Sequence, residues 1–294
     1  MPSRFKRRLR VPGMSAGLAL LLAMSGCGTV LLNDTGSLSR YDRLVSSDEV
    51  ATRAKMYMDR AAMARARTVR IVPTAFSEAV SGPGLTPVER RLVANAADRA
   101  LCYELSLRYD VVSGRKADLT VRAAVTRIEL TGLVGAGTTI ATSAGVSIAS
   151  QAGVGFATSI GRVPIPRLPI GLGSLTIEAE ALDGRNEQRA AMVWGGAANS
   201  FTSQPRFSPI SDAYDLAGDF GQDWGGYLVT GVDPFKAPLA IPSYDRIRVT
   251  TLGEAPLDPD CEAFGRAPGL DGIAADYIGL PPEYTDKGPT APVN

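Results

Sequence analysis

Histidine is absent from the 294-residue sequence. Since histidine is the commonest general base and metal ligand, its absence excludes catalytic arrangements of the Ser-His and Cys-His types. Only three cysteines are present, Cys27, Cys102 and Cys261, too few for a zinc site without histidine. We therefore expect no metal and no cofactor.

An excess of basic residues is also lacking, because 31 lysines and arginines stand against 30 acidic residues. Five of the basic residues fall within the first ten positions, so the rest of the chain is slightly acidic. Nucleic-acid-binding domains carry clustered positive charge. The composition predicts no nucleic-acid partner.

Charge is missing altogether from residues 131–161, where three octapeptides follow one another: AGTTIATS (136–143), AGVSIASQ (144–151) and AGVGFATS (152–159). In a helix, this repeat places small residues every four positions along one ridge, which allows close helix packing. The ridge comprises Gly137, Ala141, Gly145, Ala149, Gly153, Ala157 and Gly161. Three interpretations stay open: a glycine-zipper helix that meets another copy or enters a bilayer, an excursion packed on its own domain, and a flexible loop.

The first 26 residues have the organisation of a lipoprotein signal peptide. Basic residues are followed by an apolar run over residues 11–23, and then by Ser25, Gly26 and Cys27. This pattern predicts cleavage before Cys27 and its acylation, which would anchor the chain in a membrane. Gly28 stands where an aspartate would resemble an inner-membrane retention signal, so we expect the periplasmic face of the outer membrane.

The remaining chain divides by composition into three parts. Residues 27–46 are rich in small polar residues and predict a flexible tether. Residues 47–233 predict an α+β domain, with a Gly/Ala/Pro-rich insertion at 131–173. Residues 234–294 hold 10 of the 20 prolines and predict an extended tail, in which only residues 247–252 could add an edge strand.

Within the domain, hydrophobic periodicity predicts helices over residues 47–66, 87–108 and 211–230. Ser46 with Glu49, and Thr86 with Glu89, have capping-box spacing at the first two helix starts. Alternation predicts strands over residues 68–73, 109–113, 117–130, 174–182 and 188–194, with a bulge at Arg127 and a hairpin turn at Asp183. This order fits a mixed, mostly antiparallel sheet with packed helices.

Cys102 and Cys261 allow two interpretations. In an exported chain they could form a disulfide, because disulfides persist in oxidising compartments. Alternatively, Cys102 is a small buried residue of a helix and Cys261 a free thiol. The sequence does not decide between them.

Two sets of acidic residues are candidates for a metal site or for catalysis. Asp212, Asp215, Asp219 and Asp223 recur along one predicted helix, but a solvated helix face explains them better than a cation site. Glu178 and Glu180 share one face of a strand, about 6 to 7 Å apart, a spacing compatible with paired-carboxylate hydrolysis. Any half-exposed strand shows the same alternation, so we assign no catalytic residue.

Five short segments resemble, in order, the bacterial lipoprotein family DUF3313. They are residues 36–44 (GSLSRYDRL), 69–73 (VRIVP), 85–89 (LTPVE), 117–122 (ADLTVR) and 177–183 (IEAEALD). The resemblance implies no activity, since none is assigned to the family. It also implies that residues 55–59 (KMYMD) are extended, against the helix predicted for 47–66.

Three functions follow as hypotheses. The first is a non-enzymatic envelope lipoprotein that binds another envelope component. The second is a membrane-associating homo-oligomer formed through the glycine ridge. The third is a hydrolase that uses Glu178 and Glu180, which requires both side chains to face inward.

Overall fold

The computed structural model describes residues 30–48, 52–80, 84–114, 116–132, 171–199, 203, 206–236 and 241–288. Its centre is an eight-stranded mixed sheet in the order β1-β2-β8-β7-β6-β3-β5, with β4 paired to β6. The strands are β1 (Val45–Asp48), β2 (Thr52–Met58), β3 (Thr68–Ile71), β4 (Ala75–Phe76), β5 (Asp110–Val111), β6 (Leu119–Glu129), β7 (Ser174–Asp183) and β8 (Gln188–Ala197). The pairs from β1 through β2, β8 and β7 to β6 are antiparallel, whereas β3 lies parallel to β5 and β6. The α+β prediction is confirmed.

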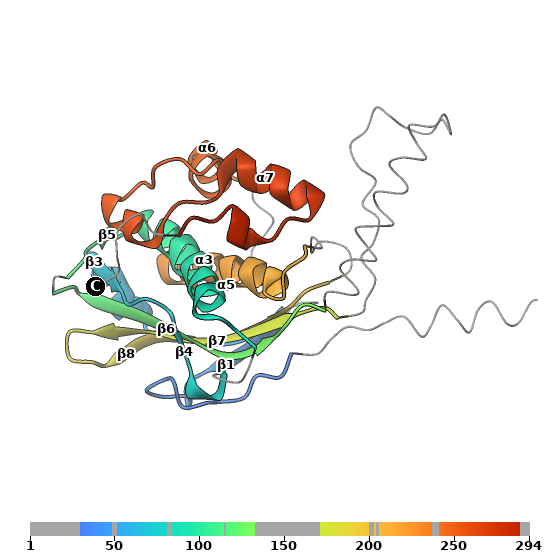
Figure 1. The fold of residues 1–294 in the computed structure, drawn as a ribbon. Helices are drawn as coiled ribbons and strands as arrows, with labels where there is room; N and C mark the ends of the chain where they lie inside the picture. Colours follow the sequence, from blue (N-terminus) through green and yellow to red (C-terminus); the bar gives the residue numbers. More distant parts are fainter. Residues whose placement is uncertain are drawn as a thin grey trace, which may run out of the picture.

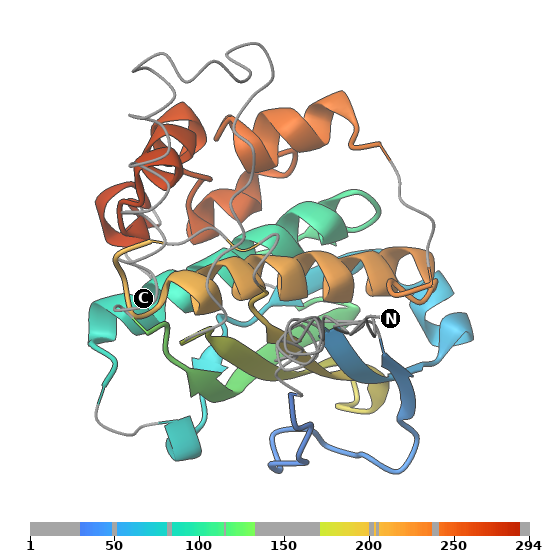
Figure 2. The same ribbon diagram turned by 90° about the vertical axis from the view of Figure 1, so that its right-hand side faces the viewer.

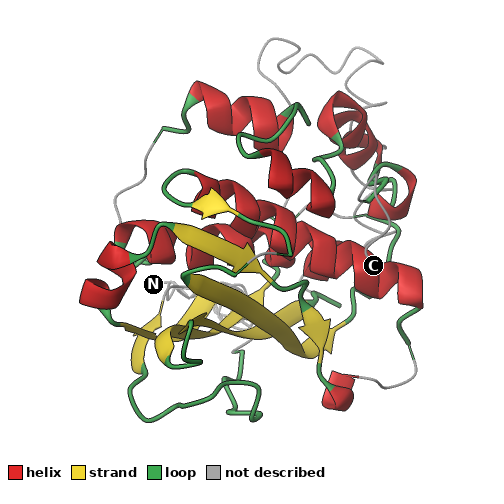
Figure 3. Ribbon diagram, turned by 90° about the vertical axis from the view of Figure 1, so that its left-hand side faces the viewer, coloured by secondary structure: helices red, strands yellow, loops and turns green. Residues whose placement is uncertain are grey.

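Two long helices, α3 (Pro87–Ser106) and α5 (Ser211–Thr230), cover one face of the sheet (Figures 1 and 3). Both begin and end close to where the sequence predicted. Thr86 and Glu89 form the expected capping box, which satisfies backbone donors at the start of α3. Between these helices and the sheet lies the core, which includes the fully buried Trp194, Phe220 and Trp224.

The glycines that weaken the helical prediction of α5 have a packing role. A Cβ atom at Gly221 would lie 2.4 Å from the carbonyl oxygen of Ala97, and one at Gly225 would lie 2.4 Å from Cβ of Glu104. Both neighbours belong to α3. The close approach of the two helices therefore requires residues without side chains at these positions.

The helix predicted for residues 47–66 is wrong over most of its length. Strands β1 and β2 occupy residues 45–58, and only α2 (Arg60–Arg65) is helical. Ala54 and Met58, spaced four apart, fit a helical stripe, but four is also a multiple of the strand period of two. Residues 52–58 form a strand because they pair with β8. The family resemblance had implied this extended conformation for residues 55–59.

The predicted flexible tether and extended tail also differ from the structure. From Val30 onward, the N-terminal segment packs on the sheet face opposite the helices (Figure 1). The C-terminal segment forms short helices over α3 and α5: α6 (Tyr244–Arg246), η3 (Ile247–Thr251), η4 (Pro259–Phe264), α7 (Gly269–Ile278) and η5 (Pro282–Tyr284). Residues 247–251 are thus helical, not an edge strand. Two of the prolines, Pro259 and Pro282, do not prevent this, because they lie in first turns, where no backbone N–H is needed.

Other predicted elements match more closely. The register of β6 shifts between Val125 and Arg127, where the sequence predicted a bulge. The β7–β8 hairpin forms, although its turn extends over residues 183–187, with Asn186 in the left-handed region. Two further short elements are α2 and the 3-10 turn η2 (Glu78–Val80).

Candidate functional site

The two carboxylates on β7 face inward. Glu178 and Glu180 project from the sheet face opposite α3 and α5, where the N-terminal segment covers them. Their exposed fractions are 1% and 0%. The orientation that a hydrolytic pair would require is present, so the hydrogen-bond partners decide whether the pair can react.

Glu178 is bound on both oxygens by the N-terminal segment. The backbone N–H of Thr35 donates to Oε1 at 2.8 Å, and the N–H of Ser37 donates to Oε2 at 3.0 Å. The hydroxyl of Tyr41 donates to Oε2 at 2.6 Å. The same hydroxyl accepts from the N–H groups of Gly36 and Leu38, so Tyr41 connects the carboxylate to the turn above it.

Glu180 is bound in the same way, one step further along the strand. Ser39 donates its N–H and its hydroxyl, both at 2.9 Å, and Gln188 donates from Nε2 at 2.8 Å. Arg122 on β6 forms a salt bridge to Oε1. Burial alone raises the pKa of Glu180, but these donors outweigh it and lower the pKa below its usual value.

These hydrogen bonds indicate that Glu178 and Glu180 have a structural role. Each of the four oxygens already accepts a hydrogen bond from the chain itself, which leaves no carboxylate oxygen oriented toward a substrate. Glu178 and Glu180 instead hold residues 35–41 against the sheet. The structure therefore gives the hydrolase hypothesis no support.

The acidic row on α5 is dispersed among separate partners. Asp212 accepts from the N–H of Gly173 at 2.7 Å, Asp215 pairs with Arg206, and Asp223 accepts from the indole of Trp194 at 2.9 Å. Asp219 is exposed. Across the described part of the chain, no three side chains of the ligating types lie together in a way that could hold a metal ion.

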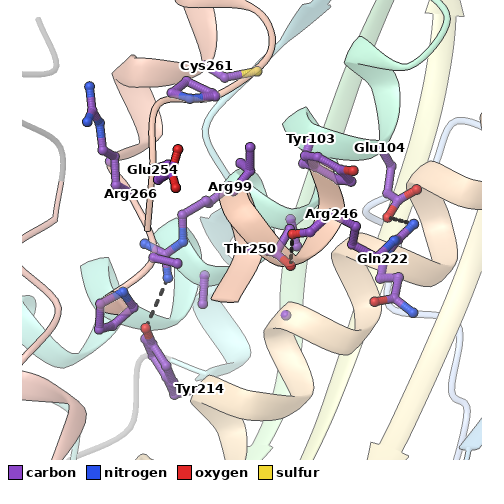
Figure 4. A pocket seen from close by; sticks show the side chains of 18 of the residues that line it. Arg99, Tyr103, Glu104, Tyr214, Gln222, Arg246, Thr250, Glu254, Cys261 and Arg266 are labelled. Carbon is purple, nitrogen blue, oxygen red and sulfur yellow. Dashed lines mark hydrogen bonds and ion pairs between the residues drawn. The ribbon is translucent and has the colours of Figure 1, made fainter. Parts of the chain in front are cut away.

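A cavity of about 310 Å³ lies between α3, α5 and the C-terminal segment (Figure 4). The ion pairs around it tie that segment to the two helices. Arg246 binds Glu104 at 2.6 Å, and Arg99 donates to Tyr214 and Asp286, both at 3.0 Å. The sequence does not predict this cavity, because its proline content indicates an extended tail over residues 234–294.

Cys102 of α3 and Cys261 of η4 are joined by a disulfide beside the cavity, with their Cα atoms 5.8 Å apart. Of the two alternatives that the sequence left open, the structure has the bridge. It connects positions 159 residues apart and fixes the C-terminal segment onto α3.

Two other groups of predicted site residues, Cys27 and the ridge from Gly137 to Gly161, lie outside the described residues. The nearest described positions are Val30 on one side, and Gly132 and Gly171 on the other. Among the helices that the structure describes, none is long and apolar enough to cross a membrane.

A family model described as "Protein of unknown function (DUF3313)" matches residues 33–224. The chain belongs to this family. The DUF3313 match includes both halves of the carboxylate arrangement, residues 35–41 and β7. It ends within α5, so the C-terminal segment lies outside it.

No curated protein is similar enough to this chain to count as a relative. Among the solved structures with some similarity to this chain are two PelC dodecamers from Paraburkholderia phytofirmans. One is a single-residue variant with 13% sequence identity and a TM-score of 0.33, covering 58% of this chain and 95% of PelC. The other has 13% identity and a TM-score of 0.35, covering 60% and 97%. Neither is close enough to support a conclusion about this chain.

Proposed function

We propose that this DUF3313 protein is a non-enzymatic lipoprotein, anchored through Cys27 at the periplasmic face of the outer membrane, whose folded domain binds another envelope component. The observation that carries the proposal is that hydrogen bonds hold the N-terminal segment against the sheet. Residues 35–41 bind the buried Glu178 and Glu180 directly after the lipoprotein signal pattern. Glu178 and Glu180, the pair of carboxylates with the spacing of a hydrolytic site, thus hold the N-terminal segment in place. This structural role is consistent with a non-enzymatic function.

The disulfide supports the proposed compartment. Disulfides form and persist in the periplasm and are rare in the cytosol. The bridge between Cys102 and Cys261 joins α3 to a segment that is also held by the Arg246–Glu104 ion pair and by the packing of Phe264 in the core. An exported chain fits this arrangement better than a cytosolic one.

The anchor is tested by metabolic labelling with palmitate and by membrane fractionation. We expect the Cys27→Ala variant to lose the label, while the matched double variant Cys102→Ala/Cys261→Ala keeps it. Gly28→Asp should move labelled protein from the outer to the inner membrane. Label that persists in Cys27→Ala would refute the anchor.

The binding role is tested at a sheet edge. β1 is the last strand on its side of the described sheet, and Val45 at its start is 71% exposed. An open edge can accept a strand from a partner. A photo-cross-linking residue at position 45 should capture an envelope component in intact cells, whereas one at Leu107, which is 49% exposed, should not. Equal capture from both positions would argue against edge binding.

The ridge of small residues in the repeat favours a second candidate function, a membrane-associating homo-oligomer. Gly132 donates its N–H to the carbonyl of Gly171 at 2.7 Å, and each glycine lies where a Cβ would meet the other's backbone within 3 Å. The described residues on either side of 133–170 therefore lie side by side.

Light scattering tests the oligomer. If the ridge drives assembly, Gly145→Leu/Gly153→Leu should reduce the molecular mass of the assembly to that of a monomer. The matched double variant Ser143→Leu/Gln151→Leu, which changes positions between the ridge residues, should not. An unchanged mass for both variants would remove this candidate.

A further inference from the structure

We propose that one end of the domain, defined by Gly132, Gly171 and Phe207 and here called the neck end, rests on the phospholipid surface of the membrane. The opposite end, formed by the β7–β8 turn at residues 183–187, then points away from the bilayer. The inference rests on the proposed anchor at Cys27 and adds which surface of the domain meets the lipid.

The reach of the chain gives the first argument. Val30 is buried and packs over Gly195 of β8, where an added Cβ would lie 2.6 Å from its side chain. Only Gly28 and Thr29 separate Val30 from Cys27. Three residues span at most about 11 Å, so an acylated Cys27 would hold Val30 close to the bilayer.

The direction of the N-terminal segment gives the second argument. The segment starts at Val30, which lies over Gly195 near the end of β8. Further along, Ser37 donates its N–H to Glu178. The carbonyl of Arg40 then accepts from the side chain of Gln188 at the beginning of β8. The segment thus runs along the hairpin toward its turn. The described part of the segment therefore begins at the opposite, open end of the hairpin, three residues after the proposed anchor in the sequence.

The neck lies at this same open end. Gly195 pairs with Thr176, and two pairs further on Ser174 pairs with Ala197 at the end of the hairpin. The contact between Gly132 and Gly171 follows directly, and the N–H of Thr131 donates to the carbonyl of Pro209 at 2.8 Å. Gly132 and Gly171, the described residues on either side of 133–170, consequently lie at the same end of the hairpin as Val30.

Exposed apolar side chains occur at both ends of the domain, including Leu107 and Val232 on the turn side, but those of the neck end lie where the anchored segment begins. The neck end of the ribbon faces the viewer in Figure 2. Several segments contribute exposed apolar side chains there. Phe207 is 50% exposed, and its N–H donates to the carbonyl of Gly279 at 3.0 Å, which places it beside the end of α7. The other members are Leu31, Leu130, Ile278 and Leu280. The turn at the other end carries charged side chains, Asp183, Arg185 and Glu187.

Lipid is the occupant that explains both features together. Apolar side chains gathered on a surface mark an interaction site, and aromatic and aliphatic groups enter the boundary between headgroups and acyl chains. A covalent lipid anchor attached within about 11 Å of Val30 would bring this end to such a boundary. A protein partner would not require the anchor and the apolar residues to share one end.

Photo-cross-linking to lipid tests the orientation. The lipidated full-length protein would be reconstituted in vesicles of phosphatidylethanolamine and phosphatidylglycerol, with benzoylphenylalanine in place of Phe207 or Leu107. These two positions are matched in exposure, at 50% and 49%. Leu107 lies at the turn end, shortly before β5. β5 begins with Asp110, which pairs with Thr68 of β3. The next residue of β3, Val69, pairs with Leu119 of β6, and Leu119 pairs with Asp183 at the turn.

We expect phospholipid adducts by mass spectrometry from position 207 and at least tenfold fewer from position 107. A probe at Ile278 should behave like the probe at 207, which covers the case in which one substitution disturbs folding. Equal adducts from both ends, or adducts only from 107, would overturn the orientation even when acylation of Cys27 is found. An unacylated Cys27 would instead refute the proposed anchor itself.

Discussion

The hydroxyl of Tyr41 lies 2.6 Å from Oε2 of Glu178, across 137 positions of sequence. This contact joins the first described segment of the chain to the central strand of the sheet. The same hydroxyl accepts from the N–H groups of Gly36 and Leu38. One side chain thus positions both the turn and the carboxylate beneath it.

Removing this hydroxyl should loosen the N-terminal segment. We expect Tyr41→Phe to lower the free energy of unfolding by about 2 kcal/mol, because a hydrogen bond to a charged group contributes about 1.5–3 kcal/mol. Urea denaturation measures the change. Tyr244→Phe is the control, since Tyr244 is 75% exposed, and it should have no effect. Equal stability of the two variants would contradict the structural role of the pair.

Asp98 should make stability depend on pH. It is 1% exposed and accepts from the N–H and hydroxyl of Thr74, at 2.9 and 2.5 Å. Burial raises its pKa to about 7, although the Thr74 hydrogen bonds act in the opposite direction. The folded protein therefore holds a proton that the unfolded chain, with a pKa of 3.8, releases.

It follows that the contribution of Asp98 is fully present below pH 4 and is lost as pH rises from about 4 to about 7. The loss amounts to about 4 kcal/mol at most, at 1.36 kcal/mol for each pH unit. Urea denaturation at pH 5 and pH 8 should show the loss for the unmodified chain. Asp98→Asn should reduce the difference between the two pH values, because the amide does not titrate and the Thr74 hydroxyl can accept from it. An identical pH dependence in the variant would show that Asp98 does not titrate in this range.

The glycines of α5 should differ according to what they face. Gly221→Ala places a methyl group against the backbone of α3, and we expect a loss of about 1–3 kcal/mol, as for overpacked cores. At Gly226 an added Cβ meets nothing within 4 Å, so Gly226→Ala should stabilise the helix by up to about 1 kcal/mol. Thermal unfolding compares the two. If both alanines are stabilising, the contact between α3 and α5 is looser than described.

The disulfide should contribute measurably to stability. We expect Cys102→Ala/Cys261→Ala to lower the free energy of unfolding by about 2–4 kcal/mol, because the bridge restricts the unfolded chain over a long loop. Dithiothreitol should produce the same loss in the unmodified chain and none in the double variant. A reductant effect that is equal in both proteins would mean that the bridge does not form.

Elements defined by neighbouring residues could be predicted from the sequence. The capping box of Thr86 and Glu89, and the alternation of the β7–β8 hairpin, depend on contacts within a few positions. Contacts between distant segments could not be predicted in this way. Glu178 alternates with apolar residues as a solvent-facing residue would, but in the structure it is buried and accepts hydrogen bonds from the distant Thr35 and Ser37.

The structure of the C-terminal segment is a second feature that could not be predicted from the sequence. Proline content predicted an extended tail, but prolines in first turns permit short helices, which then need a surface to pack on. α3 supplies that surface, with Glu104 and Cys102 as attachment points. The resemblance of residues 36–44 and 177–183 to one family pattern was the available indication that these two distant segments belong together.

The most direct test of the account is the mass of the mature protein purified from membranes. Intact-mass and peptide analysis should find a chain that begins at Cys27 and carries acyl groups on that residue. The same preparation should sediment with outer-membrane markers. A mature chain that begins at another residue, or that carries an unmodified Cys27, would contradict the lipid anchor and the orientation inferred from it.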